Sequence, residues 1–296
     1  MNNASQAKLI PPGWADCLAK NLLERKLLPA QICLVLGASD TGKTALVETL
    51  AKHLLIKNNL VALVDADTGQ SHIGPPTAVG WAVIDKPQFD ISNLPAKGIS
   101  FVGGITPTGH LLQLTSAIAQ CVEQASKAAK IIFIDTPGFI AGPAAQALWW
   151  TIQRIIKPGL IIAVQQQNEL SEILTGMQYT DARIEDVKPP ACLPAKSPEH
   201  RKRYRQQRFR KYFQNSLVYS IGLKDVAVRA NRRLDSDNTV NYLVGLTDSK
   251  GLDRAVGLVV DWSKDKNIVK VRAPEIDISS VRCLTVGDVS INIEDE

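Results

Sequence analysis

Short hydrophobic runs alternate with longer amphipathic segments through the first part of the chain. The runs occupy residues 31–37, 60–67, 99–104, 130–138 and 159–165. Helical spacing of apolar positions occurs at residues 14–28, 44–58, 108–128 and 143–157. Buried parallel strands appear as continuous apolar runs, and each needs a helix to carry the chain back across the sheet. The alternation therefore predicts an α/β fold with a doubly wound, mostly parallel sheet.

The pattern changes after residue 180. Residues 187–200 contain four prolines, which predicts a loop. From about residue 217, short runs rich in valine, isoleucine and threonine recur, as expected of a small β-rich domain. We predict a leading helical segment at 1–30, an α/β domain at 31–214 with a basic helix at about 200–213, and a C-terminal β-rich domain at 215–296.

Composition narrows the class of protein. Hydrophobic residues make up 45% of the chain and charged residues 21%, as in ordinary globular proteins. No apolar run approaches the roughly 20 residues that cross a bilayer, and residues 1–14 lack the pattern of a secretory signal. The five cysteines are far apart and form no CxxC pair, which argues against a disulfide framework or a zinc site. We expect no membrane association and a reducing, cytoplasmic setting.

Positive charge is concentrated in one segment. The net charge is +5, yet residues 196–233 hold twelve lysines and arginines against only Glu199 and Asp225. The rest of the chain is therefore acidic overall. Such an asymmetry indicates a binding site for a polyanion.

The sequence GASDTGKT at residues 37–44 fits the phosphate-loop pattern G-x-x-x-x-G-K-[ST], directly after a predicted strand and before a predicted helix. Its glycines let backbone N–H groups surround phosphate oxygens, and the helix N-terminus adds its positive dipole end. Lys43 is expected to reach the β- and γ-phosphates, and the Thr44 hydroxyl to bind Mg²⁺. The residues expected to contact the nucleotide are Gly37, Ala38, Ser39, Asp40, Thr41, Gly42, Lys43 and Thr44.

Two absences bear on the class of nucleotide-binding protein. The sequence DTPG at 135–138 is similar to the D-x-x-G element of GTPases, but no N-K-x-D motif follows it. The phosphate loop also lacks the early lysine of partitioning ATPases. These two absences leave room for a kinase, and the carboxylates Asp65 and Asp67, at the end of the second predicted strand, are compatible with one. A carboxylate there can bind magnesium or accept the proton of an attacking hydroxyl.

These motifs together resemble the P-loop polynucleotide 5'-hydroxyl kinases of RNA processing, over residues 31–296. The family's G-x-x-D-x-G-K-[ST] loop is matched, and its D-x-G-Q element is matched by Asp67, Gly69 and Gln70. Its T-P-x-x-N clasp over the nucleotide is similar to residues 106–110, and its T-x-G-W segment to residues 136–139. Histidine stands in place of the clasp asparagine, and Phe139 in place of tryptophan. About 30 residues precede the loop, so a short member without the family's N-terminal β domain is expected.

The basic stretch 201–213 resembles the arginine-rich lid of that family. In a helix, Arg201, Arg205 and Arg208 fall on one face, where they can neutralise a transferring phosphoryl group. A solvated basic helix and a simple nucleic-acid patch are the alternatives to this interpretation.

The resemblance implies ATP and Mg²⁺ as cofactors and a 5'-hydroxyl end of RNA or DNA as the substrate. The implied roles can be grouped as follows. The implied catalytic residues are Lys43, Asp67, Arg201, Arg205 and Arg208, and the clasp residues Thr108 and His110 are expected to contact the nucleotide as well. Mg²⁺ is expected to bind to Thr44, Asp67, Gln70 and Asp135. The acceptor strand is expected to contact Gln70, Thr136, Phe139 and Arg203. Two other functions remain open: a non-catalytic ATP-binding adaptor in RNA processing, and a small-molecule kinase or ATPase.

Overall fold

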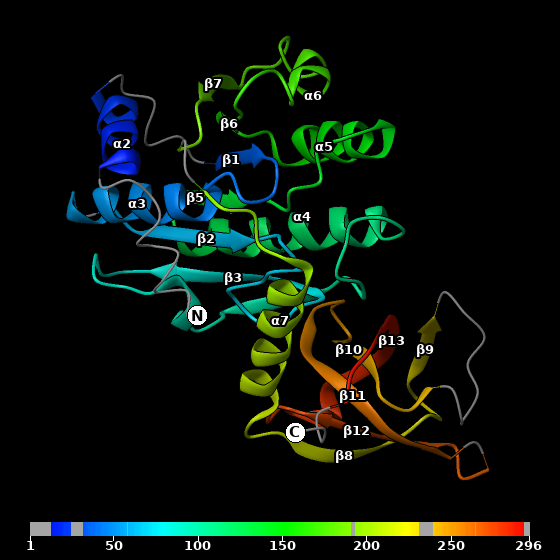
Figure 1. Ribbon diagram of the computed structural model, residues 1–296. Coiled ribbons are helices and arrows are strands. Elements are labelled where there is room, and N and C mark those ends of the chain that lie inside the picture. Colours follow the sequence, from blue (N-terminus) through cyan, green and yellow to red (C-terminus); the bar gives the residue numbers. More distant parts are fainter. Residues whose placement is uncertain are drawn as a thin grey trace.

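The computed structural model describes residues 13–24, 32–57, 59–190, 193–230, 239–263 and 265–292. It contains two β-sheets joined by a long helix (Figure 1). The leading helix α2 spans Trp14–Glu24. The last four residues of the predicted segment 14–28 lie outside the described residues.

The first sheet has seven strands in the order β4-β3-β2-β5-β1-β6-β7. Its strands are β1 Ile32–Gly37, β2 Val61–Asp65, β3 Ala78–Ile84, β4 Gly98–Phe101, β5 Ile131–Asp135, β6 Leu160–Val164 and β7 Arg183–Val187. Strands β2, β5, β1, β6 and β7 are parallel, whereas β3 pairs antiparallel with both β2 and β4. The mostly parallel α/β sheet predicted from the sequence is confirmed. In such a sheet the carboxyl ends of the parallel strands share one edge, where ligands bind.

Helices cover both faces of this sheet. The helices that follow α2 are α3 Lys43–Ile56, α4 Leu111–Ala128, α5 Pro143–Ile156 and the short α6 Ser171–Thr175. Side chains of β1 alternate between the faces: Cys33 and Val35 pack toward α3 and α2, while Leu34 and Leu36 pack toward α4 and α5. Because both faces are buried, the strands can be continuously apolar.

The second sheet has six strands in the order β8-β12-β11-β10-β13-β9. They are β8 Leu217–Gly222, β9 Ala227–Ala230, β10 Tyr242–Asp248, β11 Asp253–Ser263, β12 Ile268–Ala273 and β13 Val281–Ser290. All pairings are antiparallel except the parallel pair β13–β9. Short 3-10 helices lie at Ile91–Asn93 (η1) and Ile278–Ser280 (η2).

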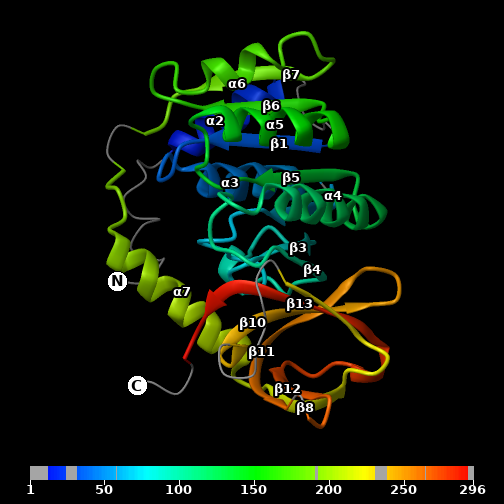
Figure 2. The ribbon, with the colours of Figure 1, turned by 90° about the vertical axis from the view of Figure 1, so that its right-hand side faces the viewer.

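Helix α7, Pro198–Phe213, runs along the first sheet toward the second (Figure 2). It begins at Ser197, whose hydroxyl accepts a hydrogen bond from the backbone N–H of His200, and proline occupies its first turn. Its last turns bury Phe209 and Phe213 in one cluster with Phe101 of β4 and residues of β10 and β11. The helix is therefore fixed at its C-terminal half, while its N-terminal half approaches the phosphate loop. Within the described ranges, no helix is both long and apolar enough to span a membrane.

Candidate active site

The phosphate loop connects the end of β1 to the start of α3. Gly42 has a left-handed backbone conformation, φ 87°, which favours glycine. A Cβ at Gly37 would lie 2.6 Å from the carbonyl oxygen of Val164, so that position has no room for a side chain. The same holds for Gly138, where a Cβ would lie 2.3 Å from the backbone nitrogen of Ser39. The loop shape thus depends on close packing against the strand ends on both sides.

Lys43 lies across the mouth of this loop. Its Nζ donates hydrogen bonds to the carbonyl oxygens of Gly37 at 2.9 Å and Ala38 at 2.7 Å. Burial lowers the pKa of the ammonium group, and the nearby carboxylates of Asp135 and Asp67 oppose that shift. Phosphate oxygens can replace the two carbonyl oxygens as acceptors, so Lys43 is positioned for a β- or γ-phosphate.

Asp135 lies beside the loop at the end of β5. The Thr44 hydroxyl donates a hydrogen bond to Asp135 Oδ2. Burial raises the pKa of the Asp135 carboxyl to about 6, against the opposing effects of Lys43 and Thr44. Its Oδ1 is buried and accepts no hydrogen bond within the described part of the chain. Next to it, the Thr136 hydroxyl donates to the carbonyl oxygen of Val35 and ties β5 to β1.

The two carboxylates at the end of β2 differ in their surroundings. Asp65 is buried and accepts hydrogen bonds from the backbone N–H groups of Asp67, His72 and Ile73. Burial, with a smaller contribution from Asp135, raises its pKa to about 8. Asp65 thus shapes the turn after β2 and does not line the pocket.

Asp67 lines the pocket that the phosphate loop opens into. Its Oδ1 accepts hydrogen bonds from the backbone N–H groups of Gly69 and Gln70, each at 3.0 Å. Its Oδ2 accepts none from the residues that the structure describes. The D-x-G-Q element therefore orients one carboxylate and leaves one of its oxygens available.

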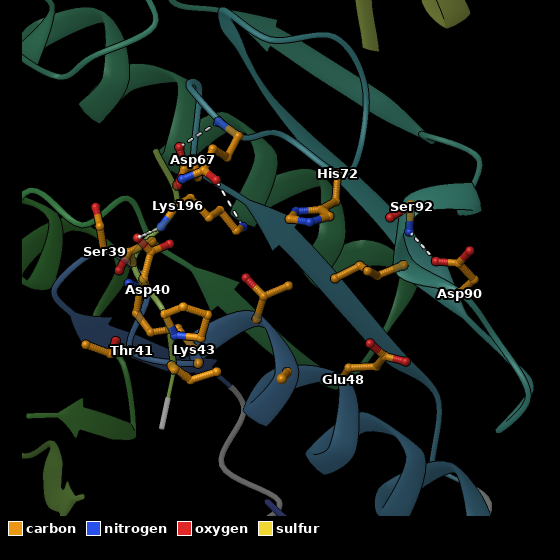
Figure 3. Close-up of a pocket in the computed structure, with 18 of the residues that line it drawn as sticks. Ser39, Asp40, Thr41, Lys43, Glu48, Asp67, His72, Asp90, Ser92 and Lys196 are labelled. Atoms are coloured by element: carbon orange, nitrogen blue, oxygen red, sulfur yellow. Dashed lines mark hydrogen bonds between the residues drawn. The ribbon is translucent and has the colours of Figure 1, made fainter. Parts of the chain in front are cut away.

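Lys196 is a pocket residue that the sequence did not reveal. Its Nζ donates to Gln70 Oε1 at 3.0 Å, and its backbone N–H donates to Asp40 Oδ2 at 3.0 Å (Figure 3). Burial lowers its pKa, and Asp40 and Asp67 oppose that shift. Lys196 belongs to the basic segment but lies in the proline-rich loop before α7, where no motif marked it.

The three arginines predicted to share a face of α7 do face the first sheet, but their partners differ. Arg201 donates to Asp40 Oδ2 at 2.6 Å, which connects the helix directly to the phosphate loop. Arg208 donates to the backbone carbonyl oxygens of His72, Gly74 and Ser92. Arg205 makes no hydrogen bond or ion pair with any described residue. Burial and Arg201 lower the pKa of Arg205, and Asp67 opposes this shift, so its guanidinium lies in the field of the pocket.

Several predicted residues are not brought to this pocket. Thr108 is exposed, and His110 lies at the start of α4 with Nε2 3.0 Å from Asp288 Oδ2 of the second sheet. Phe139 packs against the core beneath α4 and α5. Arg203 is exposed on α7, away from the face that carries Arg205. The turn before α4 touches the D-x-G-Q element only through its backbone, since a Cβ at Gly69 would lie 2.7 Å from the carbonyl oxygen of Ile105.

Comparisons with known proteins agree with this geometry. Residues 37–215 match the family model described as the mRNA cleavage and polyadenylation factor CLP1 P-loop. The chain is 31% identical to a polyribonucleotide 5'-hydroxyl-kinase of Pyrococcus abyssi, over 87% of this chain and 71% of the relative. It is 27% identical to the polyribonucleotide 5'-hydroxyl-kinase of Pyrococcus furiosus, over 100% of this chain and 97% of the relative.

The fold is also that of a solved structure. A Clp1p–Pcf11p complex superposes with a TM-score of 0.73 at 12% identity, covering 94% of this chain and 79% of that chain. At this identity the likeness concerns the fold alone, whereas the family model and the sequence relatives establish membership. The chain belongs to the CLP1 P-loop family.

Proposed function

We propose that this chain is an ATP-dependent polynucleotide 5'-hydroxyl kinase, which transfers the γ-phosphoryl group of ATP to the 5'-hydroxyl end of RNA or DNA. One observation carries the proposal: the oriented carboxylate of Asp67 lines the same pocket as the phosphate loop, and the guanidinium of Arg205, which has no hydrogen-bond partner among the described residues, interacts electrostatically with Asp67. The sequence relatives named above are kinases of polyribonucleotide ends, which favours RNA as the acceptor.

The residues at the loop fit a nucleotide triphosphate with Mg²⁺. The backbone of residues 38–44 and Lys43 would hold the phosphates. Thr44 and Asp135 would hold the metal ion, with Asp67 and Gln70 beside them, because Mg²⁺ prefers hydroxyl and carboxylate oxygens. The unpartnered Oδ1 of Asp135 is such an oxygen. When bound, Mg²⁺ orients the phosphates and neutralises part of their charge.

Asp67 would position the acceptor. Its available Oδ2 accepts the proton of the 5'-hydroxyl while the hydroxyl oxygen forms a bond to the γ-phosphorus. The bond between that phosphorus and the bridging oxygen breaks, and ADP leaves. Because two backbone N–H groups already hold Oδ1, the carboxylate needs little reorganisation to act.

Arg205 would stabilise charge on the transferring group. A guanidinium that already bonds carboxylates or carbonyls must lose those contacts before it binds phosphate, and Arg205 has no such contact with any residue that the structure describes. Arg201 and Lys196 hold Asp40 of the loop, so they keep the N-terminal half of α7 above the phosphates. An arginine supplied in this way accelerates phosphoryl transfer by roughly 10³-fold or more.

The acceptor strand is expected to extend from this pocket across basic surface. The exposed Arg203 suits contact with a backbone phosphate. Thr136, which lines the pocket, remains a residue predicted to hold the terminal nucleotide, whereas Phe139 packs against the core and does not line the pocket.

Label transfer tests the proposed function. The chain is incubated with Mg²⁺, ATP labelled at the γ-phosphate, and oligoribonucleotides or oligodeoxyribonucleotides bearing a 5'-hydroxyl. We expect labelled product, and none when the same oligonucleotides carry a 5'-phosphate. Tight ATP binding without transfer would instead favour an adaptor. Hydrolysis that is indifferent to added nucleic acid would favour a simple ATPase.

A further inference from the structure

The second sheet meets the first sheet at the end of β4, next to the turn that precedes α4. Phe101, the last residue of β4, is buried in one apolar cluster with Leu243 of β10 and Val256 of β11. Residues 102–110, here called the turn 102–110, follow it and lead into α4. No residue of the second sheet has a part in the phosphate chemistry proposed above, yet this turn contacts both the second sheet and the D-x-G-Q element.

Strand β13 approaches the turn 102–110 backbone to backbone, next to the end of β4 (Figure 2). A Cβ at Gly287 would lie 2.7 Å from the carbonyl oxygen of Gly103, so a side chain there would push the two segments apart. The backbone N–H of Asp288 donates a hydrogen bond to the same oxygen at 2.9 Å. Gly103 has φ 91°, which favours glycine. The contact therefore depends on a glycine on each side.

Backbone hydrogen bonds continue from this contact to the D-x-G-Q element. The N–H of Gly103 donates to the carbonyl oxygen of Thr77 at 3.1 Å, and the N–H of Thr77 donates to the carbonyl oxygen of Thr68 at 2.9 Å. Both threonines are buried, and Thr68 directly follows Asp67. Thr77 has φ 73°, which β-branched residues rarely adopt, so its neighbours must hold it. Because buried backbone groups stay hydrogen-bonded, a shift of Gly103 would displace Thr77 and the residues that follow Asp67.

The side chain of Asp288 forms a second link to the turn 102–110. Its Oδ2 lies 3.0 Å from His110 Nε2, while His110 Nδ1 lies 3.2 Å from the carbonyl oxygen of Thr108. The His110 ring is buried, and its Nε2 makes no hydrogen bond within the described ranges. The Asp288 carboxylate is thus positioned to orient this ring and, with it, the end of the turn.

The turn 102–110 packs directly on the residue that orients Asp67. A Cβ at Gly69 would lie 2.7 Å from the carbonyl oxygen of Ile105, and the N–H of Gly69 donates to Asp67 Oδ1 at 3.0 Å. Two backbones in such close contact have no flexible side chain between them that could absorb a movement. A displacement of about 1 Å at a reacting group can cost roughly 10²-fold in rate.

We infer that the second sheet positions the carboxylate of Asp67, and that Asp288 is the positioning residue through which it does so. Where it concerns transfer, this inference rests on the proposed function. The sheet needs no contact with ATP or with the acceptor strand, because β13 holds the turn 102–110 and this turn fixes residues 67–77. His110 thereby has a part different from the nucleotide contact that the family resemblance implied.

Two variants weaken the link at different points. Asp288→Ala removes the carboxylate that faces the turn, and Gly287→Ala separates the two backbones. Each has a control in the same sheet. Asp261→Ala removes an exposed carboxylate of β11, and Gly222→Ala adds a methyl group where nothing lies within 4 Å.

Amide hydrogen exchange tests the link without relying on transfer. We expect residues 67–77 to exchange at least about tenfold faster in Asp288→Ala and Gly287→Ala than in the unmodified chain, while β1 and β5 exchange at their normal rates. Both controls should match the unmodified chain. Unchanged exchange at residues 67–77 in both variants would overturn the inference. Equal acceleration in β1 and β5 would reflect a general loss of stability and would overturn it as well.

Transfer rates show whether the effect reaches Asp67. At saturating ATP and oligonucleotide, the single-turnover rate should fall by at least about fivefold in Asp288→Ala, with the ATP dissociation constant within about twofold of normal. Asp288→Asn keeps an oxygen toward His110, so its rate should fall by less.

A double variant separates positioning from a general effect on the fold. In an Asp67→Asn chain, Asp288→Ala should cause no further loss of rate, because residues that act through one group are not additive. Losses that simply add would overturn the inference. An unmodified chain that transfers no phosphate would refute the proposed function, and the exchange pattern would then decide this inference by itself.

Discussion

The phosphate loop and helix α7 bring positive charge to the same pocket in different ways. In the loop, the close contacts of Gly37 and Gly138 fix the backbone, and Lys43 bonds to the loop itself. On α7, Arg201 and Arg208 hold the helix against its neighbours, and Arg205 has no hydrogen-bond or ion-pair partner among the described residues. The comparison teaches that the number of cationic residues says little about which one acts on phosphate. The existing hydrogen bonds of each residue are more informative.

The largest effect is expected from removing the loop ammonium. Lys43→Ala deletes the group that reaches the β- and γ-phosphates, so transfer should fall by at least about 10³-fold and ATP binding should weaken. Single-turnover rates and ATP dissociation constants check this. Lys57→Ala, at the exposed end of α3, should behave like the unmodified chain. A Lys43→Ala chain with more than a tenth of the normal rate would contradict the role of the loop.

Asp67→Asn should separate chemistry from binding. The amide oxygen can still accept from Gly69 and Gln70, but the amide cannot take a proton, so the rate should fall by about 10²- to 10⁴-fold with ATP binding nearly unchanged. Asp65→Asn is the matched variant, since Asp65 bonds three backbone N–H groups and does not line the pocket. It should lower the free energy of unfolding, measured by urea denaturation. Equal rates in the two variants would remove Asp67 from the catalytic proposal.

Arg208→Ala should act mainly on stability. It leaves the carbonyl oxygens of His72, Gly74 and Ser92 without their charged donor, and the expected loss is about 2–4 kcal/mol in the free energy of unfolding. Arg205→Ala, which breaks no hydrogen bond to a described residue, should change the free energy of unfolding by less than about 0.5 kcal/mol. The test is urea denaturation without nucleotide. Similar free energies of unfolding for the two variants would show that the hydrogen bonds of Arg208 do not stabilise the position of α7.

The smallest effect concerns pH. Burial, with the charges of Lys196 and Arg208, lowers the pKa of His72 to about 3. The unfolded chain binds a proton at this residue near pH 6.5 and the folded chain does not, so stability is lost as the pH falls from about 6.5 toward 3. His72→Asn removes this dependence. Between pH 7.5 and 5.5, the free energy of unfolding should fall by about 1 kcal/mol more in the unmodified chain than in the variant. If this free energy depended on pH in the same way in both chains, the assigned effect of His72 would be wrong.

Local sequence was sufficient for the parts of the molecule that depend on local patterns. The five apolar runs each lie on a strand of the first sheet, and the phosphate loop follows from its own eight residues. Strand β3 was missed because it follows a stretch rich in glycine and proline. Strand β7 was missed because RIEDV, at the edge of the sheet, is largely polar and only partly buried.

The site residues that could not be predicted depend on distant contacts. Lys196 meets Gln70 across 126 positions and Asp40 across 156, and nothing near it in the sequence indicates either partner. His110 fits a motif, but the packing of the second sheet against β4 and α4 brings Asp288 to it. Helical spacing placed Arg201, Arg205 and Arg208 on one face, yet only the surrounding carbonyls and carboxylates distinguish them.

The most direct test of the account is the single-turnover transfer rate of Arg205→Ala at saturating ATP and 5'-hydroxyl oligonucleotide. Arg205→Lys keeps a charge without the guanidinium geometry, and Gln206→Ala alters the exposed neighbour on the same helix. We predict that the transfer rate falls by at least about tenfold in Arg205→Ala and by less in Arg205→Lys. The ATP dissociation constant of Arg205→Ala should change by less than twofold, and Gln206→Ala should transfer phosphate at the normal rate. A normal transfer rate in Arg205→Ala would contradict the claim that α7 supplies the catalytic arginine.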